Sequence, residues 1–433
     1  MNLYADNRLF ADYLTDFERL ASFYRRSHRL SDLRAHVPAP TRRPMTPSDL
    51  TALADFNTLP FSDAAAVRSR VDRLADPETV CTLTGQQPGL FLGPLYTIFK
   101  AIHAIRLARW LERETGRAAV PVFWIGSEDH DFDEISRIEW LDGKGVRHSH
   151  TASLPAGFDG HSVGLMPIDA RALEQLLDHW AATLPETEFR APLFALLSQA
   201  ITASKTIGDL FRHLLLRLFQ PEGLIVIDPW SPAIKRELPG LLDVEVSRPG
   251  ESTRQILAAS ERLRALGCEP QIHRRTEDVN FFLYVGGVRC KVTHAQGRFR
   301  THHPRTGEVL EEHSADSLRA LMSEHPERLS GNVATKPLVR DHVLQPIAYI
   351  AGPGEVGYYA QLRALYDDAG VPMPAIIPRV QAILLTPSIR RALKKLGLDA
   401  VQWLGLTEAQ RTEAVARRGA GAALLSRFDE ERE

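Results

Sequence analysis

The chain has 433 residues, of which 44% are hydrophobic and 24% are charged, and its net charge is −2 at pH 7. This length predicts one large α/β domain with insertions, or two domains. The near-zero charge excludes the positive field that non-specific binding of nucleic acid or an anionic membrane needs. No apolar run approaches the roughly 20 residues of a membrane helix, and the N-terminus lacks the pattern of a signal peptide. The three cysteines are far apart with no CxxC, which predicts a reducing, cytoplasmic location rather than a disulfide framework or a thiolate zinc site.

The chain is predicted to fold in three parts: a helical segment at 1–76, a core at 77–385 and a short helical tail at 386–433. The core begins with a strand at 79–85 that ends in a glycine turn. A helix at 94–114 follows, with apolar residues at helical spacing, and then a buried strand at 120–126. Strand, helix and strand in this order predict a parallel pair joined by a right-handed crossover.

Two insertions are predicted within the core, at about 147–220 and 247–340. The first consists of a short β or loop region followed by helices. The second contains a helix near 251–266 and a hairpin whose strands are joined by Gly286-Gly287, a strong two-residue turn signal. Strands at 223–228, 347–351 and 374–379 return to the sheet, and a helix continues from the glycine turn at 352–355 through Tyr366.

The first candidate site is the glycine turn Thr84-Gly85-Gln86-Gln87 and the loop after it, which lead from a strand into a helix. Free backbone N–H groups and the positive end of the helix dipole there suit a phosphate or a carboxylate. The turn has neither a Walker A nor a GxGxxG pattern, and a plain tight connection is an equal alternative. Lys100 could reach an anion at this helix end, although a surface lysine is the more common case.

The second candidate is the acidic cluster Glu128-Asp129-His130-Asp131-Phe132-Asp133-Glu134, directly after the strand at 120–126. In open α/β sheets, ligands bind at the carboxyl ends of the strands. Three functions fit these residues: acid–base catalysis by His130 with a carboxylate, binding of an amine or sugar hydroxyls, and binding of a divalent metal. A helix N-terminus rich in acids is the structural alternative, and it accounts best for Asp133 and Glu134.

A second backbone-lined turn, Gly352-Pro353-Gly354-Glu355, follows an apolar strand and is predicted at the same sheet edge. Two such turns at adjacent strand ends are what a crevice for a nucleotide or polyanion would need, and a simple proline–glycine turn is an equal alternative. Two further groups of polar residues are predicted to be surface residues without a metal site: Asn332, Lys336, Arg340 and Asp341, and the histidines His294, His302, His303 and His313.

Taken together, these motifs resemble the cysteine-adding enzymes of bacillithiol biosynthesis, the BshC family. The resemblance covers roughly residues 55–385. It rests on the two motifs above with Gly93-Pro94-Leu95-Tyr96-Thr97-Ile98 and Lys100, and on Val279-Asn280-Phe281-Phe282, Asn332 with Lys336-Pro337-Leu338, Ala348–Glu355 with Tyr358, and Pro378-Arg379. The family usually carries arginine where this chain has Lys336, a change that weakens bidentate binding of a carboxylate.

The resemblance implies a Rossmann-like core with two connecting insertions, similar to class I aminoacyl-tRNA synthetases and nucleotidylyl transferases. It implies a ligase that joins L-cysteine to the amine of glucosaminyl-malate and forms bacillithiol. No permanently bound cofactor is expected, and ATP is the candidate co-substrate that would activate the cysteine carboxylate. A metal-dependent hydrolase built on the acidic cluster and a degenerate synthetase-like binding module are the alternatives.

Within that function, His130 is predicted to accept the amine proton, tuned by Asp129 or Asp131. Glu128 and Asp131 are predicted to hold sugar hydroxyls or the ammonium of cysteine. The predicted substrate-binding residues are Thr84, Gly85, Gln86, Gln87, Lys100, Gly352, Gly354, Glu355, Tyr358 and Arg379, with no metal ligand.

The family also carries a long C-terminal coiled-coil hairpin that forms a homodimer. Too few residues follow Arg379 for that hairpin. The expectation is therefore a chain without the coiled coil, in which homodimer formation is in doubt.

Overall fold

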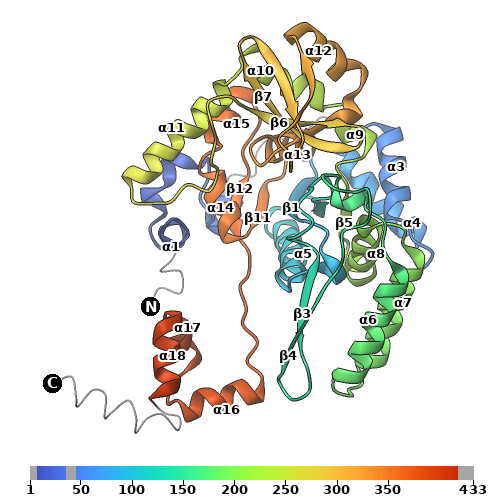
Figure 1. Ribbon diagram of the computed structural model, residues 1–433, viewed down its shortest axis with the longest axis vertical. Coiled ribbons are helices and arrows are strands. Elements are labelled where there is room, and N and C mark those ends of the chain that lie inside the picture. The colour runs from blue at the N-terminus through green and yellow to red at the C-terminus, as the bar shows by residue number, and fades with distance from the viewer. Residues whose placement is uncertain (1–6, 36–44, 418–433) are drawn as a thin grey trace, which may run out of the picture. The chain divides into compact units, whose positions relative to one another are not determined.

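The computed structural model describes residues 7–35 and 45–417 and shows an α/β protein (Figure 1). Its centre is a five-stranded parallel sheet with strand order β12-β11-β1-β2-β5. The strands are β1 (Val80–Gln86), β2 (Ala119–Ile125), β5 (Ile225–Ile227), β11 (Ala348–Ala351) and β12 (Ala375–Pro378). The predicted α/β class with a parallel core is confirmed.

The predicted strand–helix–strand unit is confirmed as β1, α5 (Tyr96–Thr115) and β2, with β1 and β2 parallel in register from Val80↔Ala119 to Gln86↔Ile125. Both strands are almost completely buried, which explains their continuous apolar sequence. One face of α5 packs on the sheet through alanines and leucines, and Gly116, with φ of 69°, ends the helix in the left-handed region.

Helix α3 (Pro47–Asn57) packs at the β5 edge of the sheet, and α4 (Ala64–Asp72) packs on α3. Helix α2 (Leu30–Ala35) packs with α5 instead. Asn57 at the end of α3 is buried, and its side chain accepts from the Val226 N–H and donates to the Val226 carbonyl, both at 2.8 Å. The amide thus pairs with the edge strand as another strand would.

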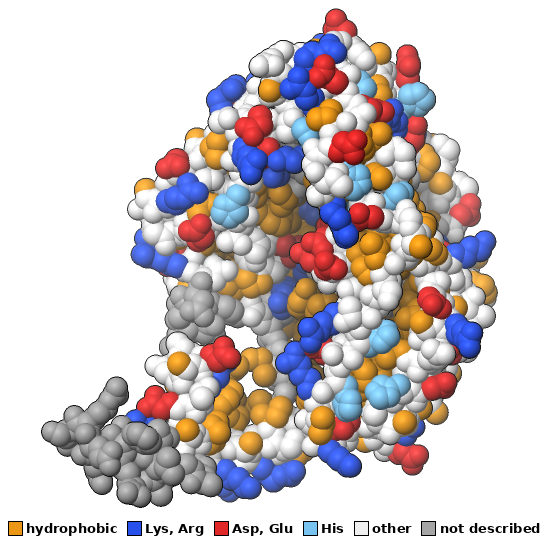
Figure 2. Space-filling model, in the orientation of Figure 1, with side chains coloured by type: hydrophobic (Ala, Val, Ile, Leu, Met, Phe, Trp, Pro, Cys, Tyr) orange, Lys and Arg blue, Asp and Glu red, His pale blue; other side chains and the backbone are white. Residues whose placement is uncertain are grey.

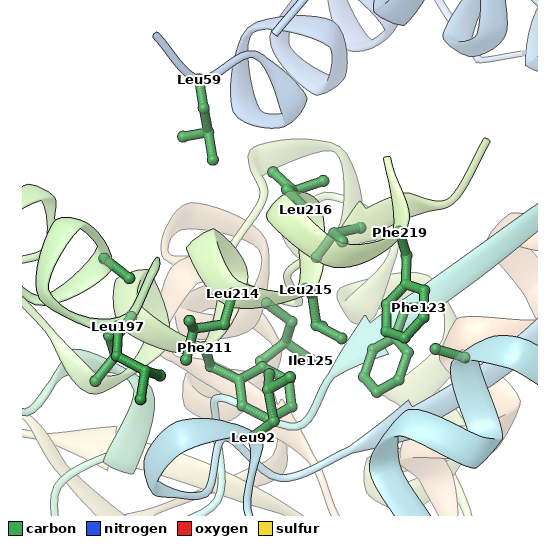
Figure 3. Packing of buried hydrophobic residues seen from close by; sticks show 14 of the residues in the cluster. Leu59, Leu92, Phe123, Ile125, Leu197, Phe211, Leu214, Leu215, Leu216 and Phe219 are labelled. Atoms are coloured by element: carbon green, nitrogen blue, oxygen red, sulfur yellow. The ribbon is translucent and has the colours of Figure 1, made fainter. Parts of the chain in front are cut away.

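The first insertion starts earlier than predicted, with the antiparallel hairpin β3 (Arg137–Leu141) and β4 (Arg147–Thr151). The helix that the acidic residues Asp133 and Glu134 could have started is therefore absent, because a strand follows them. Three helices complete this insertion: α6 (Ala170–Thr183), α7 (Arg190–Ala203) and α8 (Ile207–Phe219). The buried face of α8 packs with β2 in a large apolar cluster (Figure 3).

The second insertion carries an antiparallel sheet with strand order β10-β6-β7-β8-β9. Its strands are β6 (Asp278–Val285), β7 (Val288–Ala295), β8 (Arg298–His302), β9 (Val309–His313) and β10 (Leu329–Gly331), and its helices are α9 (Pro232–Lys235), α10 (Leu238–Ser247), α11 (Glu251–Ala265), α12 (Ala315–Glu324) and α13 (Thr335–Leu344). The predicted β6–β7 hairpin is confirmed, with positive φ at both Gly286 and Gly287.

The helix predicted through Tyr366 is two helices, α14 (Pro353–Tyr359) and α15 (Arg363–Ala369). The larger compact unit of the chain is Phe17–Val380, and the predicted boundary between residues 76 and 77 lies inside it. The smaller unit contains α1 (Arg8–Thr15), α16 (Pro387–Lys395), α17 (Ala400–Leu404) and α18 (Glu408–Ala416). The ends of the predicted segments 1–76 and 386–433 lie outside the described residues. Among those that are described, no helix has the length and apolarity to cross a membrane.

Candidate functional site

A cavity of about 610 Å³ lies where the carboxyl ends of β1, β2, β11 and β12 face the second insertion. Figure 2 shows this face hollowed, with acidic side chains gathered beside the hollow. The lining comes from both sides: Gly85, Gln86, Gln87, Tyr96, Lys100, Trp124, Gly126, Asp129, His130, Arg274, Phe282, Arg289, Asn332, Val333, Lys336, Pro337, Arg340, Tyr349, Gly352, Pro353, Gly354, Glu355, Tyr358 and Arg379. The predicted meeting of the two glycine turns at one sheet edge is therefore observed.

The first glycine turn is fixed by a close approach of strands. A Cβ at Gly85 would lie 2.8 Å from the Trp124 carbonyl oxygen, so only glycine fits this register. Further along the loop, Phe91 (φ 48°) and Leu92 (φ 74°) adopt left-handed backbone conformations that side chains disfavour. Leu92 is buried in the apolar cluster beside Phe211, which holds the loop in place despite this strain (Figure 3).

Lys100 is not the surface lysine that the residue type favours. Its side chain is only 3% exposed, and its ammonium donates to the Gly85 carbonyl at 2.9 Å and to Gln86 Oε1 at 3.1 Å. The same ammonium lies 2.6 Å from Glu355 Oε2. Lys100 therefore ties the first turn to the second, and its charge is already balanced.

The second turn is occupied by its own side chain. Glu355 Oε2 accepts from the Gly352 N–H at 2.5 Å, and Glu355 Oε1 accepts from the Tyr349 hydroxyl at 2.6 Å. A carboxylate thus fills the place where the sequence predicted a ligand anion. Gly352 and Gly354 line the cavity, but the Gly352 N–H already donates to Glu355, so the turn has fewer free N–H groups for a ligand anion than predicted.

Glu128 does not face the cavity. It is buried, and its Oε1 accepts from the Lys235 ammonium at 2.6 Å, in a pair whose side chains are each 4% exposed. Lys235 also donates to the Leu329 carbonyl at 2.6 Å and lies over the Trp230 ring. Glu128 therefore lies away from the cavity where a substrate contact was predicted for it, because its carboxylate joins the acidic loop to Lys235 of the second insertion.

Asp129 is the carboxylate of the acidic loop that lines the cavity. Its Oδ2 accepts from Gln87 Nε2 at 2.9 Å, and its Oδ1 accepts from the His130 N–H at 2.8 Å. Burial alone would raise the pKa of Asp129, but the Lys336 ammonium and the Arg289 guanidinium outweigh it and hold that pKa well below its usual range. Asp131 is exposed and does not line the cavity; its Oδ1 accepts from the Glu134 N–H at 3.3 Å.

His130 lies between the two halves of the site. Its Nδ1 is 3.1 Å from Arg289 Nη1, and its ring meets Phe282 edge-on at 5.6 Å between centroids. Burial and the Arg289 guanidinium lower the pKa of His130, which favours the neutral imidazole.

The residues predicted as surface residues at 332–341 are a buried wall of the cavity. Asn332 is buried, and Asn332 and Lys336 line the cavity. Arg340 and Asp341 form a buried ion pair of 2.9 Å, and Asp341 also accepts from the Tyr366 hydroxyl at 2.5 Å. The surface expectation failed because α13, which carries Lys336, Arg340 and Asp341, packs against α9, α10 and β10.

Four cations line the cavity without an ion-pair partner among the described residues: Arg274, Arg289, Lys336 and Arg379. Arg274 Nε donates to Asn280 Oδ1 at 2.9 Å, and Arg379 lies over the Tyr96 ring at 4.7 Å. Burial lowers the pKa of Lys336, and the Asp129 carboxylate opposes that shift. With Asp129 as the facing acid, the cavity is matched to a ligand that is mainly anionic.

Most of the remaining predicted residues line the cavity: Gln86, Gln87, Tyr358 and Arg379. Thr84 does not; its Oγ1 donates to the Ile350 carbonyl at 3.0 Å and joins β1 to β11. Sequence reasoning missed Arg274, Phe282 and Arg289 as site residues. Phe282 belongs to a motif that carries the family resemblance, but no local pattern places this part of the chain beside the acidic loop, about 150 residues earlier.

Comparison with known proteins agrees with the architecture. Residues 1–380 match the family model "Bacillithiol biosynthesis BshC, N-terminal Rossmann-like domain". The chain belongs to the BshC family. Its predicted Rossmann-like core and its resemblance to this family are thereby confirmed.

Three relatives, each named "Putative cysteine ligase BshC", show how far the similarity extends. The Geobacillus thermodenitrificans protein is 34% identical over 375 residues, which are 82% of this chain and 67% of the relative. The Salinibacter ruber protein is 33% identical over 402 residues (91% and 71%), and the Heliobacterium modesticaldum protein is 36% identical over 348 residues (78% and 60%). The matched part of the chain thus spans 60 to 71% of the length of these BshC relatives.

Proposed function

We propose that this chain is a ligase of bacillithiol biosynthesis that joins L-cysteine to the amine of glucosaminyl-malate, with activation of the cysteine carboxylate. Family membership supports the class of reaction. The observation that supports this cavity as the site of the reaction is its four cations without an ion-pair partner among the described residues, at the carboxyl ends of the sheet strands. Malate, the carboxylate of cysteine and a phosphate-bearing activating group are all anions, and ATP is the candidate source of the last.

The cations on the second insertion suit the anionic groups of the substrates, and Asp129 on the acidic loop suits the ammonium of cysteine. Lys336, Arg289 and Arg274 on the second insertion can bind carboxylate or phosphate oxygens, and guanidinium groups do so in bidentate fashion. Asp129 stays ionised because its pKa is depressed, so it can hold the ammonium of cysteine. Asp129 thereby takes the role that was predicted for Glu128 and Asp131.

The proposal is tested by turnover. The purified chain is incubated with L-cysteine, glucosaminyl-malate and ATP, and bacillithiol is measured by mass spectrometry, with each component omitted in turn. Formation of bacillithiol only in the complete mixture is expected. Binding of the substrates without any product would instead support the synthetase-like binding module.

The carboxylates of the acidic loop do not support the alternative of a metal-dependent hydrolase, because they are engaged in other contacts. Glu128 is bound to Lys235, and Asp129 is bound to Gln87. Across residues 7–35 and 45–417, no group of three or more His, Cys, Asp or Glu side chains is placed to hold a metal ion. A metal-dependent hydrolase would need such a group.

A further inference from the structure

The contact between His130 and Arg289 constrains the chemistry of the imidazole. Arg289 Nη1 lies 3.1 Å from His130 Nδ1, within hydrogen-bond distance. A guanidinium has only N–H donors and does not lose its proton in proteins. The bond therefore exists only when Nδ1 carries a lone pair, and the single ring proton of the neutral imidazole must then be on Nε2.

Arg289 is held so that it cannot turn away from His130. Its Nε donates to Ser330 Oγ at 3.0 Å, and its Nη2 donates to the Gly331 carbonyl at 2.7 Å. Its guanidinium also lies over the Phe282 ring at 3.8 Å, and the residue is 3% exposed. These partners come from β6 and β10, so three strands of one sheet fix the guanidinium that meets His130.

We propose that Arg289 is a positioning residue that locks His130 as the neutral tautomer with its proton on Nε2. His130 then offers the cavity a hydrogen-bond donor rather than the base predicted from the sequence. In the proposed ligase reaction, on which this second step rests, Nε2–H donates to an oxygen of the activated cysteine group as negative charge develops there. No bond to His130 forms or breaks.

The charges around His130 agree with this lock. Arg289 from β7 and Lys336 from α13 disfavour a second ring proton, and burial acts in the same direction. Asp129 and Asp131 from the same loop favour protonation, and Asp129 Oδ1 lies 3.9 Å from Nδ1, too far for a hydrogen bond. Burial and the cations outweigh the two carboxylates, so the pKa of His130 lies below the usual value of about 6.5 for histidine.

Nitrogen NMR of the full chain labelled with ¹⁵N-histidine tests the lock directly. The His130 signals are identified by their loss in His130→Gln. We expect a pyridine-like Nδ1 and a protonated Nε2 from about pH 7 to 8. An imidazolium at pH 7, or a protonated Nδ1, would overturn the proposal.

Substitution of Arg289 tests the cause of the tautomer. Arg289→Met removes the donor, and a mixture of the two neutral tautomers is expected, whereas Arg289→Lys retains a donor and keeps the Nε2–H form. Arg305→Met, on a side chain that is 68% exposed, is the matched control and should leave the His130 signals unchanged. If Arg289→Met does not fold, the wild-type spectrum still decides the question.

Kinetics separate a donor from a base. A glutamine at position 130 retains a side-chain N–H but cannot accept a proton as imidazole does. We therefore expect His130→Gln to keep kcat/KM within about tenfold of wild type and His130→Ala to lose about 100-fold or more, as for a lost oxyanion donor. Equal losses in the two variants would reject the donor role. The spectra need no substrate, so they decide the tautomer even if the turnover assay yields no bacillithiol.

Discussion

At the scale of single residues, the cavity depends on charges that the fold leaves unbalanced. Lys100 and Arg340 also line it, but each already pairs with a carboxylate, Glu355 or Asp341. Lys336 has no such partner among the described residues, and its ammonium is one of the charges that lower the pKa of Asp129. A half-buried cation without an ion-pair partner is costly, and a bound anion reduces that cost.

Lys336→Met should weaken binding of the anionic substrate by about 10- to 100-fold, because a hydrogen bond to a charged group contributes roughly 1.5–3 kcal/mol. Lys336→Arg should bind at least as well as wild type, since a guanidinium is the better partner for a carboxylate. Calorimetric titration with glucosaminyl-malate measures both. Lys144→Met, on an exposed hairpin lysine, is the control, and an equal loss in that variant would contradict a specific role for Lys336.

Glu128→Gln should destabilise the chain by about 3–5 kcal/mol, because Lys235 would remain buried without its counter-ion. The double variant Glu128→Gln/Lys235→Met should recover part of that loss. Urea unfolding of the three proteins measures the effect. A Glu128→Gln protein with wild-type stability but no turnover would restore the catalytic role predicted from the sequence.

At the scale of elements, several connections are made by side chains that act in place of backbone. Thr84 joins β1 to β11, Lys100 joins the two glycine turns, and Asn57 completes the edge of β5. Each closes a gap between elements that are distant in the chain. The carboxyl ends of the strands are thereby fixed relative to one another, which a site shared by four strands requires.

Asn57→Ala should cost about 2–5 kcal/mol, because it leaves the buried N–H and carbonyl of Val226 without partners. Asn57→Asp keeps the acceptor for the N–H but places a buried carboxylate against the Val226 carbonyl oxygen, so a cost at least as large is expected. Urea unfolding gives both values, and hydrogen exchange at Val226 should accelerate in Asn57→Ala. Unchanged exchange there would show that Asn57 does not close the strand edge.

At the scale of the whole molecule, the cavity belongs entirely to the larger compact unit, Phe17–Val380. Both insertions matter to it: the first carries the helices that pack behind β2, and the second supplies Arg274, Phe282, Arg289 and Lys336. The parallel sheet alone would provide half a site. A ligand that bridges the two halves should stabilise the larger unit by mass action, by about 2.7 kcal/mol at 100 times its Kd.

Hydrogen exchange with saturating glucosaminyl-malate should therefore show slower exchange in β7, α13 and the loop at 126–135. Residues 7–16 and 381–417 should exchange at the same rates with and without ligand, because they line no part of this cavity. Peptide-resolved mass spectrometry measures both. Protection confined to the smaller unit would place the ligand elsewhere.

The sequence alone determined the parallel core, because buried strands and a helical stripe leave local patterns that hydrophobic burial enforces. It also located both glycine turns and the acidic loop, since strand ends in an open sheet converge on one edge. Only the tertiary structure decided which polar side chains line the cavity. Glu128 and Thr84 make contacts within the protein, whereas Arg289 and Lys336 line the cavity. The reason is that ion pairs and burial depend on residues more than 100 positions away, such as Lys235 for Glu128 and Ile350 for Thr84.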